Sequence, residues 1–132
     1  MQNSLSFITY LCDDYDKAKD WLSATLGFVC LEDTALEGGK RWLRMAATED
    51  AQTGLLIAKA SSPEQISAIG KQFGGRVGFF LNTDSFDQMY AGMFEKGVKF
   101  REVPREEPYG KVVVFEDLYG QPWDLLQLKV NK

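Results

Sequence analysis

Two hydrophobic periods alternate along the first half of the chain and predict both strands and a helix. Apolar residues recur at helical spacing from Asp13 or Asp14 to Gly27, so either carboxylate can cap this helix and the glycine can end it. Four runs rich in apolar, β-branched or aromatic residues predict strands, at 5–12, 28–31, 41–46 and 54–60. The order predicted for this half is β-α-β-β-β.

The second half predicts the same order after a connecting helix. Ser-Pro-Glu-Gln at 62–65 combines a capping pair with a proline at the first helical position, which predicts the connecting helix at about 62–73. A further amphipathic helix is expected between Asp84 and Gly97. Residues 104–110 are polar and turn-rich and predict a mobile loop. The strands of this half are expected at 77–81, 98–103, 111–115 and 123–128.

The two halves also match residue against residue. An offset of 71 pairs the two helices and aligns Phe7 with Gly78, and an offset of 70 aligns Gly54 with Asp124. A repeat that spans half the chain indicates a tandem duplication rather than a solenoid.

The fold class predicted from this repeat is α+β, with two tandem βαβββ modules. Each module is expected to be a curved mixed sheet with a helix on its convex face, which leaves two concave faces that pack together or enclose a ligand. We expect residues 1–132 to form a single domain, with the first module at about 5–60, the connecting helix at about 62–73 and the second module at about 76–129.

Composition and charge restrict the possible partners. The chain has 132 residues, of which 45% are hydrophobic, enough for one domain with a core of its own. The formal net charge of −4 and the lack of a clustered basic face argue against nucleic acids and anionic membranes. Neither a membrane-spanning apolar stretch nor a signal peptide is recognisable, so a cytoplasmic location is expected.

The absence of histidine limits the chemistry further. Histidine is the usual metal ligand and the usual acid or base at neutral pH, so any reaction would have to use carboxylates, Tyr, Lys, Arg or the backbone. Cys12 and Cys30 lie in strand-like runs and are expected to be free, buried thiols without a catalytic role.

The last predicted hairpin carries the most specific motif, Phe-Glu-Asp-Leu-Tyr-Gly-Gln-Pro-Trp-Asp-Leu-Leu-Gln at 115–127. Together with Asp-Tyr-Asp-Lys-Ala at 14–18 and Leu-Gly-Phe at 26–28, it resembles the vicinal oxygen chelate superfamily, which includes glyoxalase I, extradiol dioxygenases and bleomycin-resistance proteins. The resemblance covers almost the whole chain. It implies paired βαβββ modules, a homodimer, and a pocket formed by the concave sheets.

The enzymes of this superfamily generally hold a metal with one residue from the first strand and one from the last strand of each module. The resemblance carries these positions onto Phe7, Gly54 or its neighbour, Gly78 and Asp124. Of the four, Asp124 alone is a carboxylate, and a divalent site needs three or more protein donors. We therefore expect no metal, no cofactor and no metal-dependent isomerase or dioxygenase activity.

Without a metal, the sequence still predicts a candidate cavity that is lined by aromatic residues and one carboxylate. Strand alternation puts Phe7, Thr9 and Phe80 on the face of the lost ligand positions, where Gly54 and Gly78 have no side chains and leave room. The alternative for the two rings is an ordinary place in the core, and for Asp124 a structural role in the hairpin.

Alternation on strand 41–46 leaves two possibilities. Either Trp42 and Arg44 face the cavity, or Arg41, Leu43 and Met45 do. An inward Arg44 would pair with Asp124 or with an anionic ligand, and an outward Arg44 would be a solvated charge.

The function expected is a metal-independent small-molecule-binding protein of the bleomycin-resistance type. It would sequester an aromatic ligand, with Asp124 and the acidic overall charge favouring a cationic group. The alternatives are a metal-dependent glyoxalase-like lyase or isomerase, and a degenerate dimerisation module without a ligand.

Overall fold

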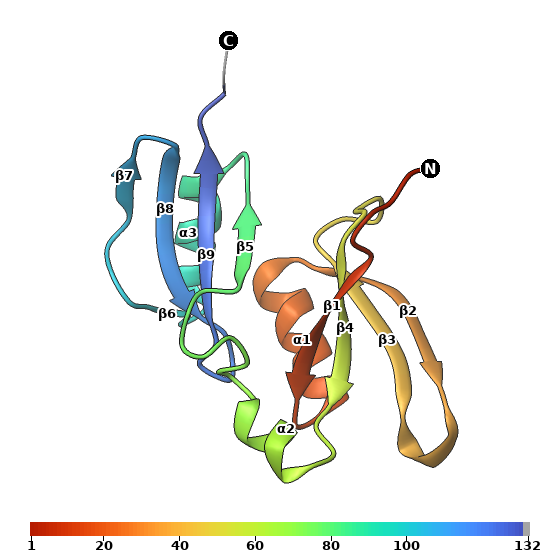
Figure 1. Cartoon of the computed structure of the whole chain (residues 1–132). Coiled ribbons are helices and arrows are strands. Elements are labelled where there is room, and N and C mark those ends of the chain that lie inside the picture. The colour runs from red at the N-terminus through yellow and green to blue at the C-terminus, as the bar shows by residue number, and fades with distance from the viewer. Residues whose placement is uncertain (131–132) are drawn as a thin grey trace. The chain divides into compact units, whose positions relative to one another are not determined.

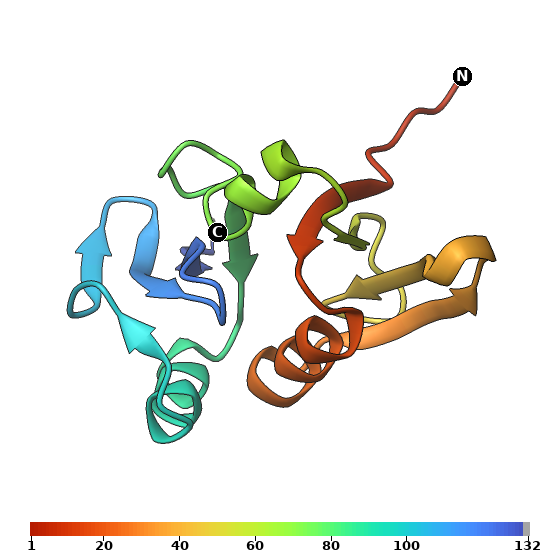
Figure 2. The ribbon, with the colours of Figure 1, turned by 90° about the horizontal axis from the view of Figure 1, so that it is seen from below.

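A computed structural model describes residues 1–130 of the chain, which divide into two compact units, one ending at Ile69 and the other beginning at Gly70. Each unit contains one curved mixed sheet with a helix on its convex face (Figure 1). Seen from below, α1 and α3 each lie along one face of their own sheet (Figure 2). The predicted α+β fold of two tandem βαβββ modules is thereby confirmed.

The first unit has the strand order β1-β4-β3-β2, with β1 parallel to β4 and the other neighbours antiparallel. Its elements are β1 (Phe7–Cys12), α1 (Tyr15–Leu26), β2 (Val29–Ala35), the short 3₁₀ turn η1 (Glu37–Gly39), β3 (Arg41–Ala46), β4 (Gly54–Lys59) and α2 (Pro63–Ala68).

Local sequence explains both ends of α1. The Asp14 side chain accepts a hydrogen bond of 3.0 Å from the backbone N–H of Lys17, and Gly27 ends the helix with φ of 72°. The buried helix residues are Ala18, Leu22 and Leu26. They cover the sheet face that carries the buried side chains of Tyr10, Leu43 and Ile57.

The second unit has the strand order β5-β9-β8-β6, and β7 adds to β8. Its elements are β5 (Phe79–Asn82), α3 (Phe86–Glu95), β6 (Lys99–Phe100), β7 (Arg105–Glu107), β8 (Gly110–Glu116) and β9 (Pro122–Leu128). Its core, on the α3 side, contains the touching rings of Phe79, Trp123 and Phe115.

Four segments differ from the sequence-based expectation. The strand expected at 28–31 extends to Ala35 as β2, and the strand expected at 98–103 is reduced to the two residues of β6. Helix α2 ends at Ala68, because Gly70 adopts a φ of 80° and approaches the carbonyl of Tyr119 closely. The segment predicted as a mobile loop contains β7, which pairs with β8 along its whole length.

The turn between β8 and β9 is built around one buried carboxylate. Asp117 accepts hydrogen bonds from the backbone N–H groups of Tyr119 and Gln121, at 2.9 and 3.1 Å, and from the indole Nε1 of Trp123 at 2.9 Å. These bonds fix the first residues of β9, and with them the position of Asp124.

Within residues 1–130, no helix is both long enough and apolar enough to cross a membrane.

Candidate functional site

Strand register decides which side chains of the first unit share a face. Residues directly opposite in neighbouring strands point to the same side, so Arg44 lies with Leu56 and Thr9, and Leu43 lies with Ile57 and Tyr10. The second row is buried beneath α1. We call the opposite face of each sheet, away from its helix, the open face of that unit. Arg44 and Trp42 belong to the open face of the first unit.

On this open face the two aromatic rings and the arginine form one cluster. Phe7 and Trp42 meet edge to face with centroids 6.1 Å apart, and the Arg44 guanidinium carbon lies 5.3 Å from the centroid of Phe7. The Nε of Arg44 also donates to Glu32 at 3.2 Å. Glu32 therefore compensates the positive charge of Arg44 within the first unit.

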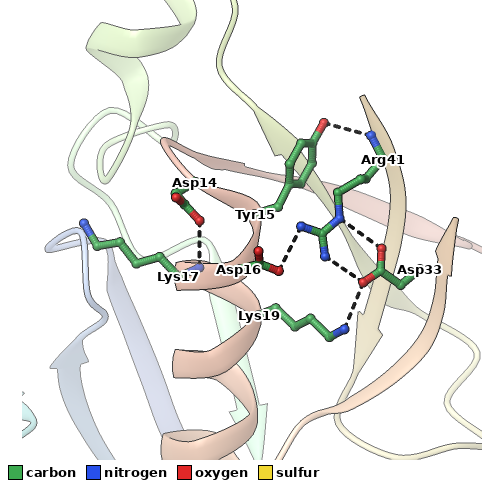
Figure 3. Close-up of polar contacts among 7 residues, drawn as sticks. All are labelled: Asp14, Tyr15, Asp16, Lys17, Lys19, Asp33 and Arg41. Atoms are coloured by element: carbon green, nitrogen blue, oxygen red, sulfur yellow. Dashed lines mark hydrogen bonds and ion pairs between the residues drawn. The ribbon is translucent and has the colours of Figure 1, made fainter. Parts of the chain in front are cut away.

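The neighbouring Arg41 points to the other face and ties the β2–β3 hairpin to α1 (Figure 3). Its guanidinium donates to Asp33 at 2.7 and 3.0 Å and to Asp16 at 2.9 Å. Hydrogen bonds from Arg41 and then Lys19 hold the pKa of Asp33 well below its usual range. These contacts serve the fold, because every charge of the group is matched within it.

The open face of the second unit has a different character. Phe80 lies opposite Asp124, which in turn lies opposite Val114. Phe80 is 64% exposed, whereas Asp124 is half-buried. Burial raises the pKa of the Asp124 carboxyl, the charge of Arg105 lowers it, and the charge of Glu102 raises it.

Arg105 is the cation whose charge lowers the pKa of this carboxyl, and other carboxylates share it. Its Nε donates to Glu102 at 2.9 Å, and its Nη1 forms an ion pair with Glu107. Glu102 also accepts a hydrogen bond of 3.1 Å from the backbone N–H of Val114. One arginine thus faces three carboxylates, so the open face of the second unit is acidic.

The four positions that correspond to metal ligands do not fit a divalent metal. Phe7 offers no donor atom, and a Cβ at Gly54 would lie 2.7 Å from the carbonyl oxygen of Met45. A Cβ at Gly78 would lie 2.1 Å from the ring of Phe73. The expectation that these glycines leave room is therefore wrong, because the neighbouring backbone and ring fill the space. Throughout the described chain, no group of three or more Cys, Asp or Glu side chains has a geometry that could hold a metal.

The register also revises the alignment of the two modules. Phe7 lies opposite Gly54, and the residue opposite Asp124 is Phe80, not Gly78. Each open face therefore carries a phenylalanine beside its last-strand position, with Gly54 as its neighbour in one unit and Asp124 in the other.

Four charged residues of these faces were missed in the sequence. Glu32 lies one residue beyond the strand expected at 28–31, since β2 continues to Ala35. Glu102 lies in the strand expected at 98–103, beyond the end of β6, and Arg105 and Glu107 lie in the segment expected to be a loop. The opposite charges of Arg105 and Glu107, two residues apart, were the available signal, but one such pair does not identify a strand.

The cysteines have no part in either face. Cys12 is buried, and burial raises the pKa of its thiol to about 11. Cys30 is free but exposed, so the expectation that it is buried is wrong.

Comparison with known proteins places this geometry in a family. A model of the Glyoxalase/Bleomycin resistance protein/Dioxygenase superfamily matches residues 4–125. An uncharacterized protein from Shewanella frigidimarina (strain NCIMB 400) is 47% identical over 129 residues, which are 97% of this chain and 96% of that protein.

Solved structures of other proteins are similar to this chain over nearly its whole length as well. TnmS3, an antibiotic binding protein from Streptomyces sp. CB03234, is 29% identical with a TM-score of 0.77, over 97% of this chain and 98% of its own. A glyoxalase/bleomycin resistance protein from the same strain is 30% identical with a TM-score of 0.71, over 94% of this chain and 100% of its own.

Proposed function

Because this chain belongs to the Glyoxalase/Bleomycin resistance protein/Dioxygenase superfamily, we propose that it is a metal-independent binding protein that sequesters an aromatic, cationic small molecule. The observation that carries the proposal is the pair formed by Phe80 and Asp124. An exposed ring beside a partly desolvated carboxylate offers a stacking surface and a counter-charge to the same ligand.

The charges around this pair favour a cation over an anion. The charge of Arg105 acts on Asp124, but Glu102 and Glu107 already share this arginine. A ligand ammonium placed over Phe80 would gain both the ring face and the Asp124 carboxylate. The antibiotic binding described for TnmS3 supports a small organic molecule as the ligand class.

The proposal extends to the remaining expected site residues and to the assembly. Gly54 and Gly78 would offer backbone groups alone, since neighbouring atoms occupy the place of a side chain. The ligand-binding residues proposed are Phe7, Thr9, Trp42, Arg44, Gly54, Gly78, Phe80 and Asp124. We further propose that the two modules form one domain, that the protein is a homodimer, and that it acts in the cytoplasm without a cofactor.

The test compares two ligands that differ in charge. Binding of 1-naphthylmethylammonium and of neutral 1-naphthylmethanol is measured by calorimetry and by thermal shift. A ligand at a hundred times its Kd should stabilise the fold by about 2.7 kcal/mol, which is readily detected. We expect Asp124→Asn to weaken the ammonium compound about tenfold and to leave the alcohol unchanged.

Asp50→Asn is the matched control, since Asp50 is an exposed carboxylate in the first unit. Equal losses for the ammonium compound and the alcohol would refute the role of the Asp124 charge. Stabilisation by Mn²⁺, Ni²⁺ or Zn²⁺ alone would favour the metal-dependent lyase or isomerase. No response to any compound would favour a module that binds a protein partner.

A further inference from the structure

The strands β3 and β4 pair over a short central stretch and then separate. Their register runs from Met45 opposite Leu55 to Leu43 opposite Ile57. Beyond that point β3 continues along β2 alone, and β4 continues along β1 alone. Figure 1 shows the β2–β3 hairpin turning away from β4 at this end. We call the space between the diverging strands the fork cleft.

The fork cleft has the size of a small-molecule site. Its volume is about 530 Å³, which lies in the range typical of ligand pockets. Its walls come from η1, from the separated ends of β3 and β4, and from the segment that leads into α2. The apolar part of the lining consists of Tyr15, Leu36, Trp42, Leu56, Ile57, Ala58 and Ala60.

The charges that line the fork cleft are all positive. They belong to Lys40, Arg41 and Lys59, and among the described residues no aspartate or glutamate lines it. This is a local reversal of sign in a chain with a net charge of −4. A positive cleft in an acidic protein attracts anions selectively.

Of the three cations, Arg41 is already neutralised by Asp33 and Asp16 (Figure 3). The two lysines differ, because neither forms an ion pair with another residue in the part of the chain that is described. Lys40 directly precedes β3 and Lys59 ends β4, so two ammonium groups without an ion pair in the described chain line the fork cleft from its two strands' separated ends.

From these observations we propose that the fork cleft binds a small aromatic carboxylate. The carboxylate pairs with Lys40 and Lys59, and the ring lies in the apolar part of the cleft against Trp42. This site goes beyond the proposed function, because it lies wholly in the first unit and selects the opposite charge.

The test uses 1-naphthylacetate and its neutral amide, which have nearly the same shape. Titration is followed by NMR at the indole Nε1–H of each tryptophan. The Trp42 signal is expected to shift with 1-naphthylacetate. The Trp123 signal is the internal control, since its Nε1 is buried and donates to Asp117.

Variants then test the charges. The double variant Lys40→Gln/Lys59→Gln should bind 1-naphthylacetate about tenfold more weakly and bind the amide unchanged. Lys17→Gln/Lys71→Gln removes two exposed lysines that do not line the fork cleft and should leave both affinities unchanged. Raising the salt concentration from about 50 mM to about 0.3 M should weaken binding of 1-naphthylacetate more than binding of the amide.

Three results would overturn the proposal. The first is the absence of a shift at Trp42 with 1-naphthylacetate. The second is equal affinity for the acid and the amide in the unmodified protein. The third is a loss in the control double variant as large as that in Lys40→Gln/Lys59→Gln. Because the probe is an anion and the readout is Trp42, failure here leaves the cation site at Asp124 standing.

Discussion

The open faces of the two units differ in how their charges are compensated. In the first unit the cation of Arg44 lies over Phe7 and pairs with Glu32, so an aromatic ring, a cation and a carboxylate satisfy one another. In the second unit the ring of Phe80 is exposed beside Asp124, and one arginine is shared among three carboxylates.

This difference teaches that a duplicated sheet can keep its fold while the charges on its open face are compensated in different ways. In the first unit the guanidinium of Arg44 lies over the ring of Phe7, where a cationic ligand could otherwise stack. In the second unit the corresponding ring, Phe80, is exposed. The contrast predicts that perturbing the charges around Phe80 and Asp124 changes the binding of a cationic ligand, whereas perturbing the pair of Arg44 and Glu32 changes stability.

The largest expected effect concerns the turns that precede the last strands. Asp117→Ala removes the acceptor of three hydrogen bonds in a buried turn, so we expect a loss of about 3 kcal/mol in the free energy of unfolding. Asp50→Ala, in the corresponding exposed loop of the first unit, should change it by less than about 0.5 kcal/mol. Urea denaturation measures both, and similar losses would show that the Asp117 bonds contribute little.

A smaller effect is expected from replacing, one at a time, the arginine on the open face of each unit. Arg44→Gln breaks the pair with Glu32 and the contact with Phe7, and should lower the free energy of unfolding by about 1 kcal/mol. Arg105→Gln should strengthen binding of this cation roughly threefold, because the carboxylates around Asp124 lose their shared partner. Weaker binding in Arg105→Gln would contradict the contrast between the faces.

The smallest effect is a pH dependence at Asp124. Its pKa is raised in the folded state, chiefly by burial, so the folded protein holds this proton at pH values where the unfolded chain has released it. The ionised carboxylate therefore lowers stability as pH rises from about 4 through the raised pKa. We expect Asp124→Asn to be more stable than the unmodified protein at pH 7 and equally stable below about pH 4. Chemical denaturation at a series of pH values checks this, and a difference that grows toward acid pH would contradict it.

The element order could be predicted from the sequence because the signals that set it are local. Asp14 and Gly27 end α1 by their own hydrogen bond and backbone conformation. The strand β7 could not be predicted, since its residues are polar and its place depends on pairing with β8. The early end of α2 depends likewise on a distant residue, the Tyr119 carbonyl that lies against Gly70.

The residues that form the two open faces were harder to predict from the sequence than the order of the elements. On strand β3 both alternations contain an arginine and apolar residues, so periodicity could not choose between Arg41 and Arg44. The choice is made by Asp16 and Asp33, which hold Arg41 on the helix side. The pairing of Phe80 with Asp124 was hidden because the sequence offset that aligns the helices differs from the one that aligns the strands.

That difference bears on how duplicated sheets diverge. Phe7 and Gly54 lie opposite one another and are 47 residues apart, whereas Phe80 and Asp124 lie opposite one another and are 44 apart, so the second module is three residues shorter between its first and last strands. Two of the three residues are missing between the first strand and the helix, where Phe7 precedes Tyr15 by eight residues and Phe80 precedes Phe86 by six. Both phenylalanines nevertheless lie on the open face of their own sheet. Shortening a connection outside the paired strands is thus a route by which a gene duplicate can change the neighbour of a recognition group while its core survives unchanged.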